Sequence, residues 1–281
     1  MLSLFQIVEK TKLNENVIKM VVSAPLIAKK ARAGQFIIFR TFADSERVPL
    51  TISDYDIKNG TVTIVFQVVG RATKELASLN KGEYINDFVG PLGKASELKN
   101  IKKAAVIGGG VGTAIAYPIA KALKEKGALV HSVVGFRNKD LVILEKEFKA
   151  NSDKLIIMTD DGSYGKKGLV TNALEELLLS GEKYDEVIVI GPLIMMKFVS
   201  ELTKKYNIKT TVSMNPIMID GTGICGGCRL TVGGEVKFAC VDGPDFDGHL
   251  VDFDECIKRS ALYKDFEKRQ REDNCNLFGG I

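Results

Sequence analysis

Short apolar runs alternate with helical patterns between residues 101 and 213. The runs are "KKAAVIGGG", "ALVHSVVGF", "DKLIIMTDD", "DEVIVIGP" and "KTTVSMNP", and patterns such as "TAIAYPIAKALKEKG" and "VTNALEELLLSG" lie between them. Strands that are apolar along their whole length are typical of a parallel sheet covered by helices on both faces. The alternation therefore predicts a doubly wound α/β domain over residues 99–213. Ligands of such sheets bind at the carboxyl ends of the strands.

Residues 1–98 have the pattern of an all-β unit. "QIVEKTKLNENVIKMVVSAP", "GQFIIFRTF", "RVPLTISDYD" and "GTVTIVFQVV" are rich in β-branched residues, and Asn59 and Gly60 supply a hairpin turn. This pattern predicts an antiparallel barrel or sandwich.

Residues 214–281 combine a cysteine-rich loop, the hairpin "CRLTVGGEVKFAC" and a charged helix near 253–272. This segment has too few apolar residues for a large core. We expect a metal cluster to supply the missing stabilisation. The helix is expected to have a solvated face, with docking to a partner subunit as the alternative.

Charge and hydropathy exclude several classes of partner. The net charge of +4 is spread over 39 basic and 35 acidic residues, which gives no field that would favour nucleic acid. No apolar run approaches the roughly 18 to 20 residues of a membrane span, and the first twelve residues lack the apolar region of a signal peptide. We therefore expect a cytoplasmic protein. Three of its five cysteines lie close together, which in a reducing compartment favours metal ligation over disulfides.

The stretch "MIDGTGICGGC" at residues 218–228 carries the strongest chemical signal. The spacing Asp220-x4-Cys225-x2-Cys228, followed by Cys240, reproduces the plant-type iron–sulfur pattern with aspartate in place of the first cysteine. We interpret these four residues as the ligands of a cluster. Cys256 is the alternative fourth ligand, and zinc is the alternative metal. Cys256 and Cys275 are otherwise expected to be free thiols.

"VIGGGVGT" places four glycines where a strand turns into a helix. Glycine lets a dinucleotide pyrophosphate approach the backbone and the N–H groups of the helix N-terminus. Thr113 departs from the G-x-G-x-x-G pattern at the last position, and a simple tight turn is the alternative. Two further glycine-bearing turns, "TDDGSYG" and "IGPLIMM", are expected at the same edge of the sheet.

In the first segment "RVPLTI" and "FQVVGRAT" pair a cationic strand end with a glycine-threonine turn. Arg47 could neutralise a pyrophosphate, and Thr51 could hydrogen-bond a flavin ring atom. Thr73, with the backbone of Ala72, could bind phosphate oxygens. An edge strand followed by a β-turn is the alternative. His131 and His249 are expected to be structural, and Met195 and Met196 to be core residues.

Taken together, the R-x-P-L-T strand, the "GGGVGT" turn and the C-terminal cysteine loop resemble the ferredoxin-reductase-like flavoproteins that serve as electron-transfer subunits. This group contains the electron-transfer subunit of dihydroorotate dehydrogenase B and the small subunit of NADH-dependent reduced ferredoxin:NADP oxidoreductase. The resemblance covers essentially the whole chain. It implies an antiparallel β-barrel that binds FAD (1–98), a doubly wound parallel sheet that binds NAD(H) (99–213) and a small [2Fe-2S] domain (214–281).

The resemblance also implies which residues contact the cofactors. The implied flavin contacts are Arg47, Pro49, Leu50, Thr51, Gln67, Gly70, Ala72 and Thr73. The implied dinucleotide contacts are Gly109, Gly110, Val111, Gly112 and Thr113, with Asp161, Gly162, Gly191 and Pro192 near the nicotinamide. Hydride exchange is expected at the flavin N5 near Thr51, which makes Thr51 the candidate catalytic residue.

Two departures bear on the family assignment. Val48 separates Arg47 from Pro49, where related reductases have Arg-x-Tyr-Ser or Arg-Pro-x-Ser, so Arg47 is expected to approach the flavin differently. Asp220 replaces the first cysteine of the dihydroorotate pattern, which favours the ferredoxin:NADP oxidoreductase group. We then expect a larger flavin and iron–sulfur partner subunit that handles ferredoxin and NADP(H). The alternatives are the dihydroorotate dehydrogenase subunit, a stand-alone reductase and a zinc-stabilised nucleotide-binding module. Family resemblance, rather than Arg137 or Lys139, favours NAD over NADP.

Overall fold

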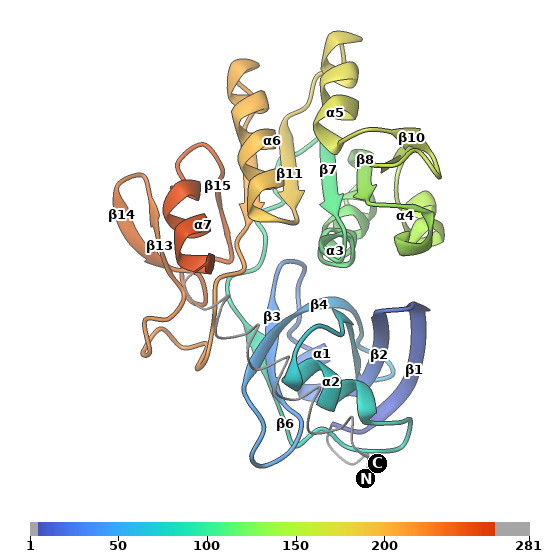
Figure 1. Cartoon of the computed structure of the whole chain (residues 1–281), viewed down its shortest axis with the longest axis vertical. Helices are drawn as coiled ribbons and strands as arrows, with labels where there is room; N and C mark the ends of the chain where they lie inside the picture. Colours follow the sequence, from blue (N-terminus) through green and yellow to red (C-terminus); the bar gives the residue numbers. More distant parts are fainter. Residues whose placement is uncertain (1–4, 262–281) are drawn as a thin grey trace.

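The computed structural model describes residues 5–261, which form three parts (Figure 1). The first part is a six-stranded antiparallel sheet in the order β1-β2-β5-β4-β3-β6. Its elements are β1 (Ile7–Asn14), β2 (Val17–Ser23), α1 (Pro25–Ala28), β3 (Phe36–Arg40), β4 (Val48–Asp56), β5 (Thr61–Gln67), α2 (Arg71–Ser78) and β6 (Asp87–Leu92). The backbone N–H of Ile85 donates to the carbonyl of Phe5 at 3.0 Å, and Ile7 donates to Glu83 at 2.9 Å. These bonds join the two ends of the sheet, so the predicted antiparallel barrel is confirmed.

The second part is a sheet in the order β10-β9-β8-β7-β11-β12-β15. Its strands are β7 (Lys103–Gly109), β8 (Leu129–Phe136), β9 (Lys154–Thr159), β10 (Lys166–Lys167), β11 (Glu186–Ile190), β12 (Thr210–Ser213) and β15 (Asp245–Asp247). All neighbours are parallel except β15, which runs antiparallel to β12. The strand order reverses between β7 and β11, which is the point where doubly wound sheets bind ligands.

Helices cover both faces of this sheet. They are α3 (Gly112–Glu125), η1 (Lys139–Leu141), α4 (Glu145–Ala150), α5 (Val170–Leu179) and α6 (Leu193–Lys205). One apolar core contains side chains of α3 and α4, such as Ile119 and Phe148. The other contains side chains of α5 and α6, such as Leu174 and Val199. The predicted doubly wound domain is therefore confirmed.

The third part contains β13 (Arg229–Val232), β14 (Glu235–Phe238) and α7 (Phe253–Ala261) beside α6 (Figure 1). Its strand β15 belongs to the second sheet, so the sheet contains strands from both sides of residue 213. The domain boundary at residue 213 stays a prediction. Apolar residues of this part, including Met218, Leu230 and Phe253, are buried in the same core as α5 and α6. The third part thus has no large core of its own because it shares the core of its neighbour.

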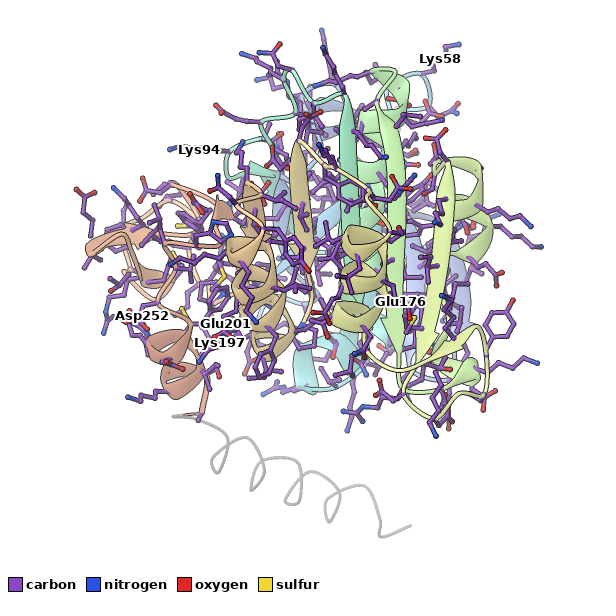
Figure 2. The ribbon with its side chains drawn as sticks, turned by 90° about the horizontal axis from the view of Figure 1, so that it is seen from above. Lys58, Lys94, Glu176, Lys197, Glu201 and Asp252 are labelled. Carbon is purple, nitrogen blue, oxygen red and sulfur yellow. The ribbon has the colours of Figure 1, made fainter. Side chains whose placement is uncertain are left out.

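Helix α7 packs on α6 through an ion pair as well as apolar contact. Lys197 Nζ lies 2.7 Å from Asp254 Oδ1, and Figure 2 shows Lys197 and Glu201 of α6 close to Asp252, just before α7. Residues beyond Ala261, including Cys275 and the rest of the predicted tail helix, lie outside the described residues. None of the helices within residues 5–261 combines the length and the hydropathy of a membrane-spanning segment.

Candidate functional site

The turn from β7 into α3 lies directly against the turn from β11 into α6. A Cβ atom on Gly112 would lie 2.7 Å from the carbonyl oxygen of Ile190, and one on Gly191 would lie 3.2 Å from the Cα of Gly109. Neither position has room for a side chain unless the backbone moves. The two turns therefore approach each other at the switch point of the sheet, as a dinucleotide site at this edge requires.

Gly110 and Val111 lie just before α3, and Thr113 lies in its first turn. Gly110 donates its N–H to the carbonyl of Gly135, and Val111 is the N-cap. Thr113 is fully buried, and its Oγ1 has no hydrogen-bond partner among residues 5–261. The N–H groups of Thr113 and Ala114 bond to the carbonyls of Gly110 and Val111. Among residues 5–261 those of Val111 and Gly112 have no backbone acceptor, so they are the donors that this end of α3 can offer to an anion.

The turn after β11 places Pro192 at the N-cap of α6. Met196 is fully buried, as expected for a core residue. Met195 is partly buried, and its Cε would lie 2.5 Å from a Cβ on Gly191. The thioether of Met195 thus fills the space next to the two glycine turns.

Asp161 and Gly162 follow β9, which is separated from β11 by β8 and β7. Three strand spacings of about 4.8 Å place this turn roughly 14 Å from Gly191 and Pro192 along the edge. These two turns cannot both lie at the nicotinamide end of one extended dinucleotide, although both lie at the carboxyl edge. Asp161 Oδ1 accepts hydrogen bonds from the Ser163 hydroxyl at 2.6 Å and its N–H at 2.9 Å. These bonds, that of the hydroxyl first, lower the pKa of Asp161, so the carboxylate is ionised at neutral pH.

In the barrel, strand β4 separates its side chains between two faces. Val48 and Leu50 pack against the barrel core, and the alternation of a strand puts Pro49 and Thr51 on the opposite face. Leu50 can therefore reach a flavin outside the barrel only through its backbone. Arg47, just before the strand, is four residues from Thr51, so strand alternation places both on the same face.

The start of α2 lies next to the end of β5. Gln67 is exposed at the last position of β5, and Gly70 is the N-cap of α2. Thr73 Oγ1 accepts hydrogen bonds from the N–H groups of Val69 and Gly70 and donates to the carbonyl of Gly70 at 3.0 Å. The hydroxyl of Thr73 is thus engaged within the turn. The N–H groups of the first helical turn, including that of Ala72, remain the donors for a phosphate.

The four predicted metal ligands form two pairs. Cys228 Sγ and Cys240 Sγ are 3.3 Å apart, and both residues are buried. Cys225 Sγ is 3.4 Å from Asp220 Oδ1, and this second pair lies nearer the surface because Cys225 is exposed. Cys256 lies on α7, packed against the core of the second sheet, and burial raises the pKa of its thiol to about 11.

Asp220 is held ionised by its own loop. Its carboxylate accepts hydrogen bonds from the N–H groups of Thr222 at 3.1 Å, Ile224 at 3.1 Å and Cys225 at 3.0 Å. These bonds, that from Thr222 first, lower the pKa of Asp220 to about 2. Burial raises the pKa of the Cys240 thiol to about 12, so a metal must displace its proton on binding.

The donor set fits a two-iron cluster better than a single ion. A tetrahedral metal with metal–sulfur bonds of about 2.3 Å separates two ligand sulfurs by roughly 3.8 Å, close to the spacing within each pair. Within residues 5–261 no three Cys, His, Asp or Glu side chains converge as ligands of one metal ion. A [2Fe-2S] cluster needs two terminal ligands on each iron, and the arrangement supplies two and two.

The cysteine loop also touches the barrel. Arg47 Nε donates to the carbonyl of Ile219 at 3.0 Å, although 172 residues separate them. A Cβ on Gly221, which has a φ of +77°, would lie 2.7 Å from Cδ1 of Ile38 on β3. The strand with the predicted flavin contacts and the loop with the predicted metal ligands are therefore in direct contact.

Sequence reasoning missed two arginines that contact the same loop. Arg229 Nη1 donates to the carbonyl of Gly226, and Arg259 Nη2, from α7, donates to the carbonyl of Gly227, both at 3.3 Å. Charge alone does not distinguish such arginines from surface ones. His131 bonds to Tyr184 and His249 to Thr203, which fits the structural roles expected for both histidines.

Comparison with known proteins gives matches to the cysteine loop and to the whole chain. Residues 215–252 match the family model of the iron–sulfur cluster binding domain of dihydroorotate dehydrogenase B. A Thermotoga maritima protein named "dihydroorotate dehydrogenase B (NAD(+)), electron transfer subunit homolog" is 47% identical over 266 residues, which cover 95% of this chain and 94% of that protein. The dihydroorotate dehydrogenase B (NAD(+)) electron transfer subunit of Streptococcus mutans is 32% identical over 255 residues, 87% of this chain and 96% of that one.

A solved structure described as that of the NADH-dependent reduced ferredoxin-NADP oxidoreductase is similar in both sequence and fold. It is 46% identical and has a TM-score of 0.91, with 97% of this chain and 98% of that chain covered. The predicted ferredoxin-reductase-like fold is confirmed by this match.

Proposed function

This chain belongs to the family of the dihydroorotate dehydrogenase B electron-transfer subunits, and we propose that it exchanges hydride between NAD(H) and FAD and passes single electrons through a [2Fe-2S] cluster to a larger partner subunit. The observation that carries this proposal is the pairing of Asp220 with Cys225 and of Cys228 with Cys240 on a loop that touches the barrel. A bound flavin can accept two electrons as hydride and release them singly, and the cluster carries one at a time.

The residues of the chain then have separate tasks. The glycine turns at β7 and β11 admit the dinucleotide backbone, and the N-terminus of α3 binds its pyrophosphate. The N–H groups at the start of α2 would bind flavin phosphate, and Thr51, on the outer face of β4, would face the flavin ring. Asp161 would then be at the adenosine end, three strands from Gly191, where an ionised carboxylate suits a ribose with free hydroxyls better than one with a phosphate.

The complex we favour is the NADH-dependent reduced ferredoxin:NADP oxidoreductase, an electron-bifurcating transhydrogenase. Support comes from the 46% identity and TM-score of 0.91 to that structure over 97% of this chain. The Streptococcus subunit is 32% identical, whereas the Thermotoga homolog that carries the dihydroorotate name is 47% identical, so identity alone does not separate the two complexes. Asp220, at the position of the first cysteine in the pattern, also favours the ferredoxin:NADP oxidoreductase. In this proposal ferredoxin and NADP(H) react at the partner, and the complex is cytoplasmic. The alternative is the electron-transfer subunit of dihydroorotate dehydrogenase B.

The identity of the co-purifying protein tests this assignment. A tagged chain isolated without oxygen from its native cells should bring down one larger flavin and iron–sulfur protein, and the complex should reduce ferredoxin only when NADPH and NAD⁺ are both present. An orotate-linked partner would favour the alternative. Robust reductase activity of the chain alone, with no partner, would contradict both.

One variant pair tests where the partner binds. Ile224 is 88% exposed next to Cys225, and Leu179 is 73% exposed at the end of α5. Ile224→Asp should release the partner, whereas Leu179→Asp should not, because only Ile224 lies beside a cluster ligand. Loss of the partner with Leu179→Asp alone would place the interface on the helical face instead.

A further inference from the structure

We propose that Arg47 is a positioning residue that holds the cluster-ligand loop on the flavin strand, through the hydrogen bond from its Nε to the carbonyl of Ile219. This inference rests on the proposed function and deepens it. The sequence makes Arg47 a candidate to neutralise a pyrophosphate, whereas the structure gives its Nε a protein partner on a distant segment.

The position of the bond along the chain makes it relevant to the cluster. Ile219 immediately precedes Asp220, so the accepting carbonyl belongs to the peptide unit that leads into a predicted ligand. Arg47 immediately precedes β4 and is four residues before Thr51, so alternation along the strand places the two residues on the same face. One side chain therefore connects the strand at the flavin ring with the residue expected to bind an iron.

Packing on both sides of Ile219 brings the loop to the same surface of the barrel. Met218 is 5% exposed and shares a core with Phe36 and Ile38 of β3. Gly221 packs so closely on β3 and β6 that a Cβ would lie 2.7 Å from Ile38 Cδ1 and 2.8 Å from Leu92 Cδ1. Ile219 itself is 53% exposed, so its side chain does little to hold this point of the loop. The charge-assisted bond from Arg47 is the contact that does so.

The Nη1 and Nη2 groups of Arg47 can donate hydrogen bonds to a second partner. Within residues 5–261 its Nη1 and Nη2 have no hydrogen-bond partner. A guanidinium has five N–H donors in a fixed plane, so it can hold the Ile219 carbonyl through Nε while the other end binds an anion. A lysine has one donor group and cannot do both in this geometry.

Hydrogen exchange measured by mass spectrometry on the purified whole chain tests the proposal. Asp220 accepts bonds from the N–H groups of Thr222, Ile224 and Cys225, so exchange in residues 217–225 reports directly on this loop. Arg47→Met should speed this exchange about tenfold, as expected for losing one charge-assisted hydrogen bond. Arg47→Lys should restore part of the protection, and the EPR spectrum of the reduced cluster should change in the Met variant.

Two further variants serve as the second test and the control. Gly221→Ala forces a Cβ into Ile38 and Leu92 at a positive φ, so it should loosen the same residues. Arg259→Met removes the contact to Gly227 from α7, and should leave the exchange of residues 217–221 unchanged. Unchanged exchange and an unchanged EPR spectrum in Arg47→Met would overturn the proposal. Loss of FAD from Arg47→Met with unchanged loop exchange would also overturn it, in favour of a pyrophosphate role.

The two proposals fail separately. A chain purified without oxygen that holds neither flavin nor cluster contradicts the proposed function. Even then, comparing the hydrogen exchange of residues 217–225 between Arg47→Met and wild type shows whether Arg47 holds this loop on the barrel.

Discussion

Cys228 Sγ and Cys240 Sγ lie 3.3 Å apart at the open end of the hairpin formed by β13 and β14, where Cys228 precedes the first strand and Cys240 follows the second. The four residue pairs of this hairpin, from Arg229 with Phe238 to Val232 with Glu235, bring the two cysteines together. Because backbone pairing in the hairpin brings these two thiols together, half of the predicted ligand set is positioned by the fold. The other two predicted ligands, Asp220 and Cys225, belong to a loop that is more exposed to solvent.

Substitutions of Asp220 distinguish it from Cys256 as the fourth ligand. Asp220→Ala should lose or destabilise the cluster, since one iron would keep a single protein ligand. Cys256→Ala should leave the cluster intact because that thiol, on α7, packs against the apolar core. Asp220→Cys should keep a cluster with an altered EPR spectrum, because thiolate is softer than carboxylate. Iron content and EPR of the reduced protein measure all three. Cluster loss in Cys256→Ala alone would refute this ligand set.

A side chain at Gly112 should damage the dinucleotide site. In Gly112→Ala the new Cβ lies 2.7 Å from the backbone oxygen of Ile190, so the turns must separate. Overpacking of this kind costs about 1–3 kcal/mol of unfolding free energy, and NADH should bind more weakly. Urea unfolding and an NADH titration measure the two effects.

Glu176→Ala is the matched control for that change. Glu176 pairs with Lys166 on the exposed face of α5, where an ion pair is worth about 0–1 kcal/mol. Its removal should leave NADH binding as in the wild type. Equal NADH affinity in Gly112→Ala and Glu176→Ala would place the dinucleotide elsewhere.

Removing the charge of Asp161 should relax the preference for NADH over NADPH. The carboxylate is ionised at neutral pH and would repel a ribose 2′-phosphate. Asp161→Ser should raise the rate with NADPH relative to NADH by about tenfold. Stopped-flow reduction of the flavin by each nucleotide gives this ratio. Asp140→Ser, on the neighbouring η1, is the control and should not change the ratio of the two rates. An unchanged ratio in Asp161→Ser would show that Asp161 does not contact the ribose.

His131 should make unfolding free energy depend on pH near neutrality. Burial in β8 lowers the pKa of His131 below its usual value of 6.5. The unfolded chain then binds more protons than the folded one below about pH 6.5, so stability falls as pH drops through this range. His131→Gln should reduce the slope between pH 7 and pH 5 in urea unfolding. A slope equal to that of the wild type would mean that the histidine is solvated in the folded state.

Much of the fold follows from local patterns in the sequence. The apolar strands and intervening helices of residues 101–213 and the β-rich first segment each form the predicted type of structure, because burial on one or both faces determines the spacing of apolar residues. The pairing of β15 with β12 had no such signal. β15 is three residues long and polar, and its place in the sheet depends on the path of the whole third part.

The candidate site was predictable where one short segment carries it and not where two segments meet. Asp220, Cys225 and Cys228 could be grouped by spacing alone. The contact of Arg47 with Ile219 could not, since a hydrogen bond across 172 residues leaves no periodic pattern. The distance between Asp161 and Gly191 depends on strand order, which residue composition does not reveal.

EPR spectroscopy with cofactor analysis on the chain purified without oxygen tests the central claim most directly. The account predicts about one FAD and two irons per chain, and a rhombic signal of a reduced [2Fe-2S] cluster after NADH or dithionite. Reduction by NADH should bleach the flavin first, because hydride enters there. A colourless protein that contains zinc and gives no EPR signal on reduction would contradict the account.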